Sequence, residues 1–185
     1  MRGARCPSLL TGVQTPHPLP LPGKGAAAAL DDISKNLQEQ VLPELVPLLS
    51  QILSHDDWTR QESGILALGA IAEGCLGGMT EHLPQLMPFL FDCLRHEHAL
   101  VRSITCWSIS RYSAWIISSG PELLYNVVEA LLERIMDGSK RVQVAACTAF
   151  SFLEEVCVWV GKAGWTWRCR PRQRGRGGSR VGVLR

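Results

Sequence analysis

One predicted helix, over residues 99–117, carries a tryptophan and an arginine away from its apolar stripe. The stripe itself consists of Val101, Thr105, Ile109, Tyr112 and Ile116. Another face presents Ile104, Trp107 and Arg111 at i, i+3 and i+7. Trp and Arg are favoured at the centres of protein interfaces, so this face is a candidate binding surface. The same spacing fits a Trp107 packed between helices with Arg111 reaching solvent, and spacing alone leaves both interpretations open.

Comparable faces recur on the other helices that the sequence predicts. Their members are Ala27, Ala28 and Asp31, then Glu62, Leu66 and Glu73, and last Thr148, Phe152 and Glu155. Stacked helices would line these faces along one concave wall, which we expect to be acidic with apolar spots. Such a wall suits an extended basic peptide better than a compact partner.

An internal repeat provides the helices that position these faces. The segment from Leu42 to Leu49 matches the segment from Leu83 to Leu90 at an offset of 41 residues, and residues 123–135 keep the apolar spacing. Each segment is followed by a polar break and a second apolar run, at 59–75, 99–117 and 140–156. Helix pairs with a period of roughly 40–47 residues are typical of HEAT or armadillo solenoids.

Residues 26–37 match the second helix of a further, incomplete unit. The predicted fold is therefore all-α, an α-solenoid of HEAT repeats with about three and a half helix pairs over residues 25–156.

Charge divides the chain of 185 residues into three parts. Residues 1–24 hold three bases and residues 157–185 hold eight, with no acid in either part. Of 19 bases and 17 acids in total, the middle therefore keeps 8 bases and all 17 acids, a net charge of −9. Neither end has a periodic apolar face, so we expect residues 1–24 and 157–185 to be disordered.

The tail over residues 157–185, rich in Arg, Gly and Trp, has two interpretations. Its arginines suit phosphates and its tryptophans suit stacked bases, as in a nucleic-acid binder. Alternatively, it is unselected sequence attached where the repeat ends, and the abrupt loss of pattern within a helix favours this second interpretation.

Catalytic, metal and membrane sites find no support in the sequence. Cys93, His96 and His98 offer metal-ligand atoms but straddle a helix end and a turn, so we predict no metal site. No catalytic motif or cofactor-binding loop occurs, so an enzyme is not expected. No apolar run reaches the roughly 20 residues of a membrane-spanning helix, and we expect no membrane partner.

The seven cysteines include no C-x-x-C pair, which indicates a reducing compartment rather than a disulfide framework. Four of them lie in apolar helical patterns and are expected to be buried: Cys75, Cys93, Cys106 and Cys147.

Three stretches resemble the transportin family, also called karyopherin-β2, of the importin-β superfamily. They are residues 62–75, residues 99–112 and residues 140–143. The family consists of nuclear import receptors built of HEAT repeats, and the resemblance covers roughly residues 26–155, a central part of a much longer receptor. It implies that this chain binds proline-tyrosine nuclear localisation signals, which are extended, overall basic segments ending in a Pro-Tyr pair.

The resemblance also implies roles for individual residues. The pocket for the Pro-Tyr end would comprise Ala27, Ala28, Leu66, Ile104 and Trp107. Asp31 and Arg111 match its polar neighbours, whereas Thr148 and Glu155 match positions that meet the more N-terminal, basic part of the signal.

The partners implied by the resemblance are cargo proteins, RNA-binding proteins among them, together with nucleoporins and the GTPase Ran. The N-terminal arch that mainly binds Ran lies outside the resemblance, so we expect cargo binding rather than the whole import cycle. The implied localisation is the cytoplasm and the nucleus. A HEAT scaffold for protein assembly is the alternative, and the pairing of Trp107 with Arg111 argues against it.

Overall fold

The computed structural model describes residues 24–162, and side chains are described for residues 25–155. Helices follow one another without any strand in this part of the chain, which confirms the all-α prediction. They are α1 (Lys24–Leu37), η1 (Gln38–Val41), α2 (Leu42–Leu53), α3 (Trp58–Ala70), α4 (Ala72–Met79), α5 (Leu83–Cys93), α6 (Ala99–Arg111), α7 (Ser113–Ser118), α8 (Pro121–Ile135) and α9 (Lys140–Lys162).

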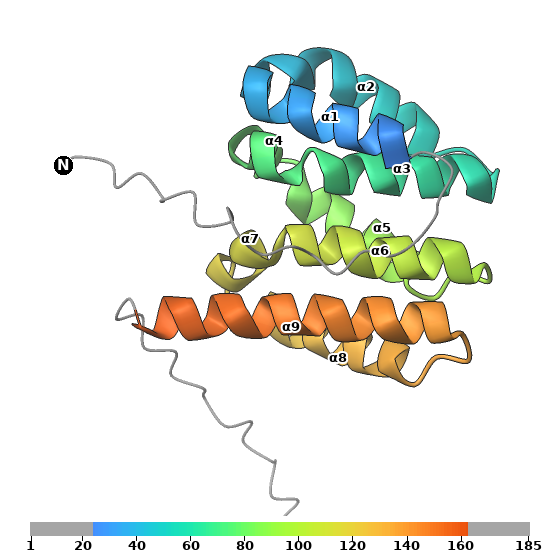
Figure 1. Cartoon of the computed structure of the whole chain (residues 1–185), viewed down its shortest axis with the longest axis vertical. Helices are drawn as coiled ribbons and strands as arrows, with labels where there is room; N and C mark the ends of the chain where they lie inside the picture. Colours follow the sequence, from blue (N-terminus) through green and yellow to red (C-terminus); the bar gives the residue numbers. More distant parts are fainter. Residues whose placement is uncertain (1–23, 163–185) are drawn as a thin grey trace, which may run out of the picture.

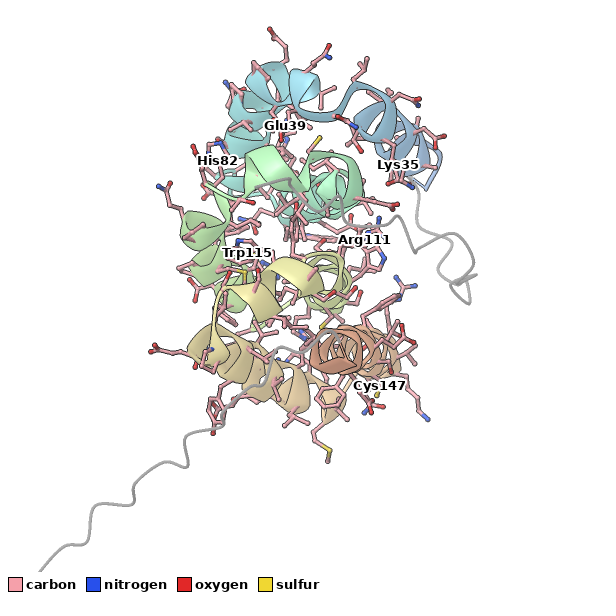
Figure 2. The ribbon with its side chains drawn as sticks, turned by 90° about the vertical axis from the view of Figure 1, so that its left-hand side faces the viewer. Lys35, Glu39, His82, Arg111, Trp115 and Cys147 are labelled. Carbon is pink, nitrogen blue, oxygen red and sulfur yellow. The ribbon has the colours of Figure 1, made fainter. Side chains whose placement is uncertain are left out.

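The helices form two layers, as Figures 1 and 2 show from perpendicular directions. One layer, here called the first-helix layer, contains α2, α5 and α8. The other, the second-helix layer, contains α1, α3 with α4, α6 with α7, and α9. The pairs stack in chain order, and within the described residues no helix precedes α1, which agrees with the predicted three and a half helix pairs.

Two boundaries differ from the prediction. The second helices of the first two full units are not single runs, because the chain breaks at Ile71 and again at Tyr112. Beyond the first break, Gly74 lets α4 lie directly on α1, since a Cβ there would overlap the backbone of Ser34. Helix α9 extends to Lys162, so residues 157–162 continue a helix instead of beginning the tail. The rest of the predicted disorder lies outside the described residues.

The 41-residue period repeats down to single hydrogen bonds in the turns. The side chains of His55, His96 and Asp137 each accept a hydrogen bond from the backbone N–H two residues later, at 3.0, 3.0 and 2.9 Å. The backbone carbonyls of the same three residues accept hydrogen bonds from side chains six residues later, at 2.8, 2.7 and 2.6 Å. Turns of one construction therefore precede the three second helices.

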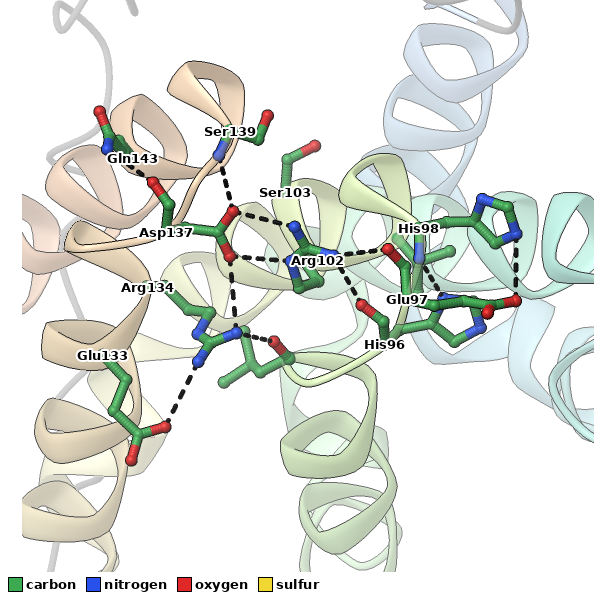
Figure 3. Close-up of polar contacts among 12 residues, drawn as sticks. His96, Glu97, His98, Arg102, Ser103, Glu133, Arg134, Asp137, Ser139 and Gln143 are labelled. Atoms are coloured by element: carbon green, nitrogen blue, oxygen red, sulfur yellow. Dashed lines mark hydrogen bonds and ion pairs between the residues drawn. The ribbon is translucent and has the colours of Figure 1, made fainter.

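Unlike the two histidines, Asp137 also reaches into the neighbouring unit (Figure 3). Its carboxylate accepts two hydrogen bonds from the Arg102 guanidinium, at 2.8 and 2.9 Å, and lies 3.5 Å from Arg134. The hydrogen bonds from Arg102 and from the Ser139 N–H outweigh the effect of burial and hold the pKa of Asp137 below its ordinary value. This ion pair joins the last two units through their turns.

The apolar stripe predicted over residues 99–117, which α6, Tyr112 and α7 carry, is the centre of the core. All five of its members have an exposed fraction of 0%. Two buried hydrogen bonds fix α6 against α3: Ser108 Oγ donates to the Ile65 carbonyl and Tyr112 Oη donates to the Leu68 carbonyl, both at 2.7 Å. Because each donor meets a specific backbone oxygen, the helices cannot slide past each other without leaving buried polar groups unpaired.

Burial of the cysteines follows the prediction with one exception. Cys75, Cys93 and Cys106 are buried as expected, but Cys147 is exposed. Cys147 lies 41 residues after Cys106, and the Cys106 position is covered by α9, whereas no described helix follows α9. The prediction was wrong at Cys147 because burial at this position depends on a neighbouring unit.

Candidate functional site

Three predicted site residues occupy equivalent positions on successive second helices. Leu66, Trp107 and Thr148 are separated by steps of 41 residues on α3, α6 and α9. Leu66 and Trp107 pack against the core but remain half-buried, and Thr148 is exposed, with its hydroxyl donating to the Val144 carbonyl at 2.9 Å. The period therefore places an apolar residue, an aromatic residue and a small polar residue in one row across the second-helix layer.

Trp107 lies directly on the backbone of α3 because the facing residue, Gly69, has no side chain. A Cβ at Gly69 would lie 2.8 Å from Cε3 of the indole and 2.7 Å from Ser108 Oγ, both too close for any real contact. The indole is thus seated between two units while part of it remains exposed. Trp107 both packs and presents a surface, so the two interpretations of its spacing are not exclusive.

Arg111 does not extend freely into solvent, contrary to the packing interpretation of its spacing. Its guanidinium lies 6.0 Å from the centre of the Trp107 ring and donates to Glu73 Oε2 at 3.0 Å. The same Nη2 atom lies 3.7 Å from Asp31 Oδ1. Only 23% of the Arg111 side chain is exposed, because residues of α1 and α4 surround it.

A fourth charged residue completes this cluster. Lys35 Nζ lies 2.8 Å from Asp31 Oδ2 and 3.1 Å from Glu73 Oε2. We call Lys35, Asp31, Glu73 and Arg111 the ionic cluster; it joins α1, α4 and α6, and Figure 2 shows Lys35 and Arg111 on the same side of the molecule.

Electrostatics within the ionic cluster favour the charged forms. The hydrogen bond to Asp31 raises the pKa of Lys35 above its ordinary value, although partial burial opposes this. Burial opposes the ionisation of Glu73 too, but hydrogen bonds from Lys35 and Arg111 outweigh it and lower the pKa of Glu73. The cluster is therefore a set of four mutually supporting charges next to a half-buried tryptophan.

The remaining predicted site residues are distributed around this centre. Ala27 is half-buried and Ala28 exposed, one turn before Asp31 on α1. Ile104 is only 5% exposed, so it belongs to the core more than to a free surface. Glu155 is exposed near the far part of α9, and among the described side chains no ion pair or hydrogen bond connects it or Thr148 with the ionic cluster.

The charges of the second-helix layer as a whole balance, although the faces predicted to form the wall hold four acids and one base. Within residues 25–156 its acids are Asp31, Asp32, Glu62, Glu73, Glu154 and Glu155, and its bases are Lys35, Arg60, Arg102, Arg111, Lys140 and Arg141. Six acids and six bases cancel, so the whole net charge of −9 lies on the first-helix layer and in the turns. An acidic wall formed by the predicted faces stays a prediction.

Two residues of the ionic cluster were missing from the predicted site. Lys35 is four residues after Asp31, a spacing at which opposite charges meet on a helix, and this signal was available in the sequence. Glu73 shares a predicted face with Leu66, but its pairing with Arg111 depends on the break after α3 and on the contact between units. Only the tertiary structure reveals that pairing.

The described residues contain no group of three or more His, Cys, Asp or Glu side chains arranged to hold a metal ion. Within the same part of the chain, no helix is both long and apolar enough to span a membrane.

Comparison with known proteins places the repeat in a family context. Residues 58–112 match the HEAT-like repeat family. Transportin-1 from Homo sapiens is 52% identical over 133 residues, and importin subunit beta-2 from Schizosaccharomyces pombe is 44% identical over 137 residues. Each alignment covers 71% of this chain but only 15% of the relative, so the chain spans a small part of the relatives it matches.

A solved structure gives an independent view of the fold. A chain from the structure describing how Kap95p binding induces the switch loops of RanGDP to adopt the GTP-bound conformation superposes with a TM-score of 0.65. It is 23% identical and covers 70% of this chain and 15% of that chain. At this identity the likeness supports the HEAT-repeat solenoid and carries nothing about binding.

Proposed function

The chain is homologous to one segment of the transportins, and we propose that its second-helix layer binds the Pro-Tyr end of proline-tyrosine nuclear localisation signals. The observation that carries the proposal is the seat of Trp107: the indole packs on the backbone at Gly69 and lies 6.0 Å from the Arg111 guanidinium, yet it stays partly exposed. Trp and Arg are enriched among the few residues that carry most of the binding energy at interfaces.

The Pro-Tyr pair of the ligand would rest on the row formed by Leu66 and Trp107. Prolyl and tyrosyl rings present apolar faces, so they would pack on an indole and on a leucine with a large area removed from water. Ala27 and Ala28 would leave room for the ligand on the α1 side, because their methyl side chains are small. Ile104 is only 5% exposed, so we propose that it packs in the core instead of contacting the ligand.

The more N-terminal part of the signal would run toward α9, past Thr148 and Glu155. Both residues are exposed, so a ligand can reach them without displacing any core side chain. The neutral sum of the second-helix layer means that the basic part of a signal meets individual acids and not a general negative field. We therefore propose modest electrostatic attraction and a binding energy centred on the aromatic contact.

A protein that binds import signals would meet its cargo in the cytoplasm and release it in the nucleus, and we propose both as the localisation. Cargo proteins, RNA-binding proteins among them, are the proposed partners. For Ran and for nucleoporins the described residues supply no separate argument.

The proposal is tested by fluorescence polarisation of labelled peptides with the full chain. We expect an extended basic peptide ending in Pro-Tyr to bind, and its Ala-Ala counterpart to bind at least about tenfold more weakly, because the lost contact is the interfacial centre. Trp107→Ala should give a similar loss. Tyr125→Ala is the matched control: it removes an aromatic side chain that is 62% exposed on α8, in the other layer, and should leave binding unchanged.

A second variant guards against an effect on folding alone. Thr148→Arg adds a bulky cation at an exposed position of the same row, so the fold should persist while the basic peptide binds more weakly. Equal binding of the Pro-Tyr and Ala-Ala peptides would refute the pocket. Tight binding of single-stranded RNA, with no binding of either peptide, would instead support nucleic-acid recognition.

A further inference from the structure

The two acids of the ionic cluster, Asp31 and Glu73, are already occupied by cations of the same chain. Lys35 spans them from one side, at 2.8 and 3.1 Å, and Arg111 spans them from the other, at 3.7 and 3.0 Å. A ligand that presents a cation near Trp107 therefore competes for these acids with the two resident cations.

The two resident cations are held unequally. Arg111 is 23% exposed and also contacts the Trp107 ring, so moving it would disturb the seat of the indole. Lys35 is 39% exposed, and it forms ion pairs with the two acids. Exposed ion pairs of a flexible lysine are weak, because water and side-chain entropy compete with them. Lys35 is therefore the cation that can be displaced.

The hydrogen bonding of the ionic cluster is also incomplete. Asp31 Oδ1 is a buried atom with no hydrogen-bond donor, and Nε of Arg111 is a buried donor with no acceptor. An ammonium group interacts as a point charge, whereas a guanidinium donates two parallel hydrogen bonds to carboxylate oxygens. An incoming arginine thus has more donors to offer to the acid pair than Lys35 has.

We propose that Lys35 is a specificity-determining residue: it closes the acid pair of Asp31 and Glu73, and a ligand arginine next to the apolar anchor opens the pair by displacing it. This inference rests on the proposed function, because the ligand is the same peptide that contacts Trp107. A peptide with arginine near the Pro-Tyr pair can replace the Lys35 ammonium on the acid pair with a guanidinium, which offers more hydrogen-bond donors. Peptides with a neutral residue there cannot, and Lys35 stays in place.

The alternative is that Lys35 only connects α1 with α4. The two roles predict different changes in peptide affinity when Lys35 is replaced by a neutral residue of similar length. A connecting role predicts that Lys35→Gln lowers the stability of the fold and leaves peptide affinity equal or reduced. The competing role predicts that Lys35→Gln raises the affinity for an arginine peptide, since the ligand no longer has to displace a resident charge.

The test measures dissociation constants of the full chain and of Lys35→Gln for two Pro-Tyr peptides. One peptide has arginine next to the anchor and the other has glutamine at that position. We expect Lys35→Gln to bind the arginine peptide about three- to tenfold more tightly than the unchanged chain does, the range that one or two exposed ion pairs support. The glutamine peptide should bind both proteins equally.

Two controls separate the local effect from general charge. Lys140→Gln removes an exposed cation at the start of α9, outside the ionic cluster, and should leave the affinity for both peptides unchanged. Lys35→Arg keeps a cation on the acid pair with more donors, so it should weaken binding of the arginine peptide relative to Lys35→Gln.

The outcomes are distinct. If the unchanged chain binds the Pro-Tyr peptides but Lys35→Gln alters neither affinity, the competing role of Lys35 is wrong and the proposed function stands. Equal tightening for both peptides would also overturn it, because the effect would not depend on the ligand arginine. If no protein binds either peptide, the proposed function fails, and the role of Lys35 fails with it.

Discussion

Gly69 provides a quantitative test of how the Trp107 seat is built. Replacing it with alanine has two opposite effects on the free energy of unfolding. A helical Gly→Ala change ordinarily stabilises by about 1 kcal/mol. Here the added Cβ would lie 2.8 Å from the rigid indole and 2.7 Å from a hydroxyl that already donates a buried hydrogen bond. Overpacking of this kind costs about 1–3 kcal/mol, so the net expectation is a loss of about 0–2 kcal/mol.

The cause can be isolated in a double-mutant cycle. In a Trp107→Ala background the ring is absent, whereas Ser108 Oγ, 2.7 Å from the added Cβ, still crowds it. Gly69→Ala should then be less destabilising by about 1–2 kcal/mol, within the usual range of coupling between residues in contact. Gly25→Ala is the matched control, since a Cβ there meets nothing within 4 Å, and its effect should be the same in both backgrounds.

The assay is urea unfolding followed by circular dichroism at 222 nm, with four proteins for the cycle and two for the control. Binding adds a second readout. Gly69→Ala should also weaken binding of the Pro-Tyr peptide, because the indole has to shift to admit the methyl group. An equal cost of Gly69→Ala with and without the Trp107 ring would refute the reasoning, since the seat would then not depend on contact between this glycine and the indole.

Three further predictions concern the scaffold. The pKa of Asp137 in the folded state is below its ordinary value of 3.8, so its carboxylate stabilises the fold above pH 3.8 and this contribution is lost as pH falls through the lowered pKa. In urea unfolding at pH 7, Asp137→Asn should lower the free energy of unfolding by about 2–3 kcal/mol. The difference from the unchanged chain should vanish well below pH 3.8. Tyr112→Phe leaves the buried Leu68 carbonyl without its donor and should cost about 1–3 kcal/mol in the same assay, whereas no loss would exclude that hydrogen bond as a register constraint. Iodoacetamide should modify Cys147 before Cys93 and Cys106, whose thiol pKa values burial raises to about 12, and peptide mapping that found Cys106 modified first would contradict the described packing.

The repeat could be predicted from the sequence because it depends on local spacing. The offset between the segments at Leu42 and Leu83, and the polar breaks that follow them, fix the helix pairs without any tertiary information. The apolar stripe of α6 was predictable for the same reason. Each of these features is set by which residues lie on one face of one helix.

Features that depend on contact between units could not be predicted in this way. Cys147 has the same local pattern as Cys106, but its exposure depends on whether a further helix covers it. The breaks at Ile71 and Tyr112 lie within continuous apolar patterns, and the pairing of Glu73 with Arg111 joins residues far apart in the sequence. The balance of charge within the second-helix layer could not be obtained from a sum along the sequence, because that sum combines both layers.

The central claim is that a Pro-Tyr ligand rests on the second-helix layer at Trp107. Photo-cross-linking tests it most directly: the tyrosine of the peptide is replaced by benzoylphenylalanine, the complex with the full chain is irradiated, and the cross-linked residues are identified by mass spectrometry. The account predicts cross-links to α1, α3 and α6, around Ala28, Leu66 and Trp107. Cross-links confined to α2, α5 and α8 would place the ligand on the opposite layer and contradict it.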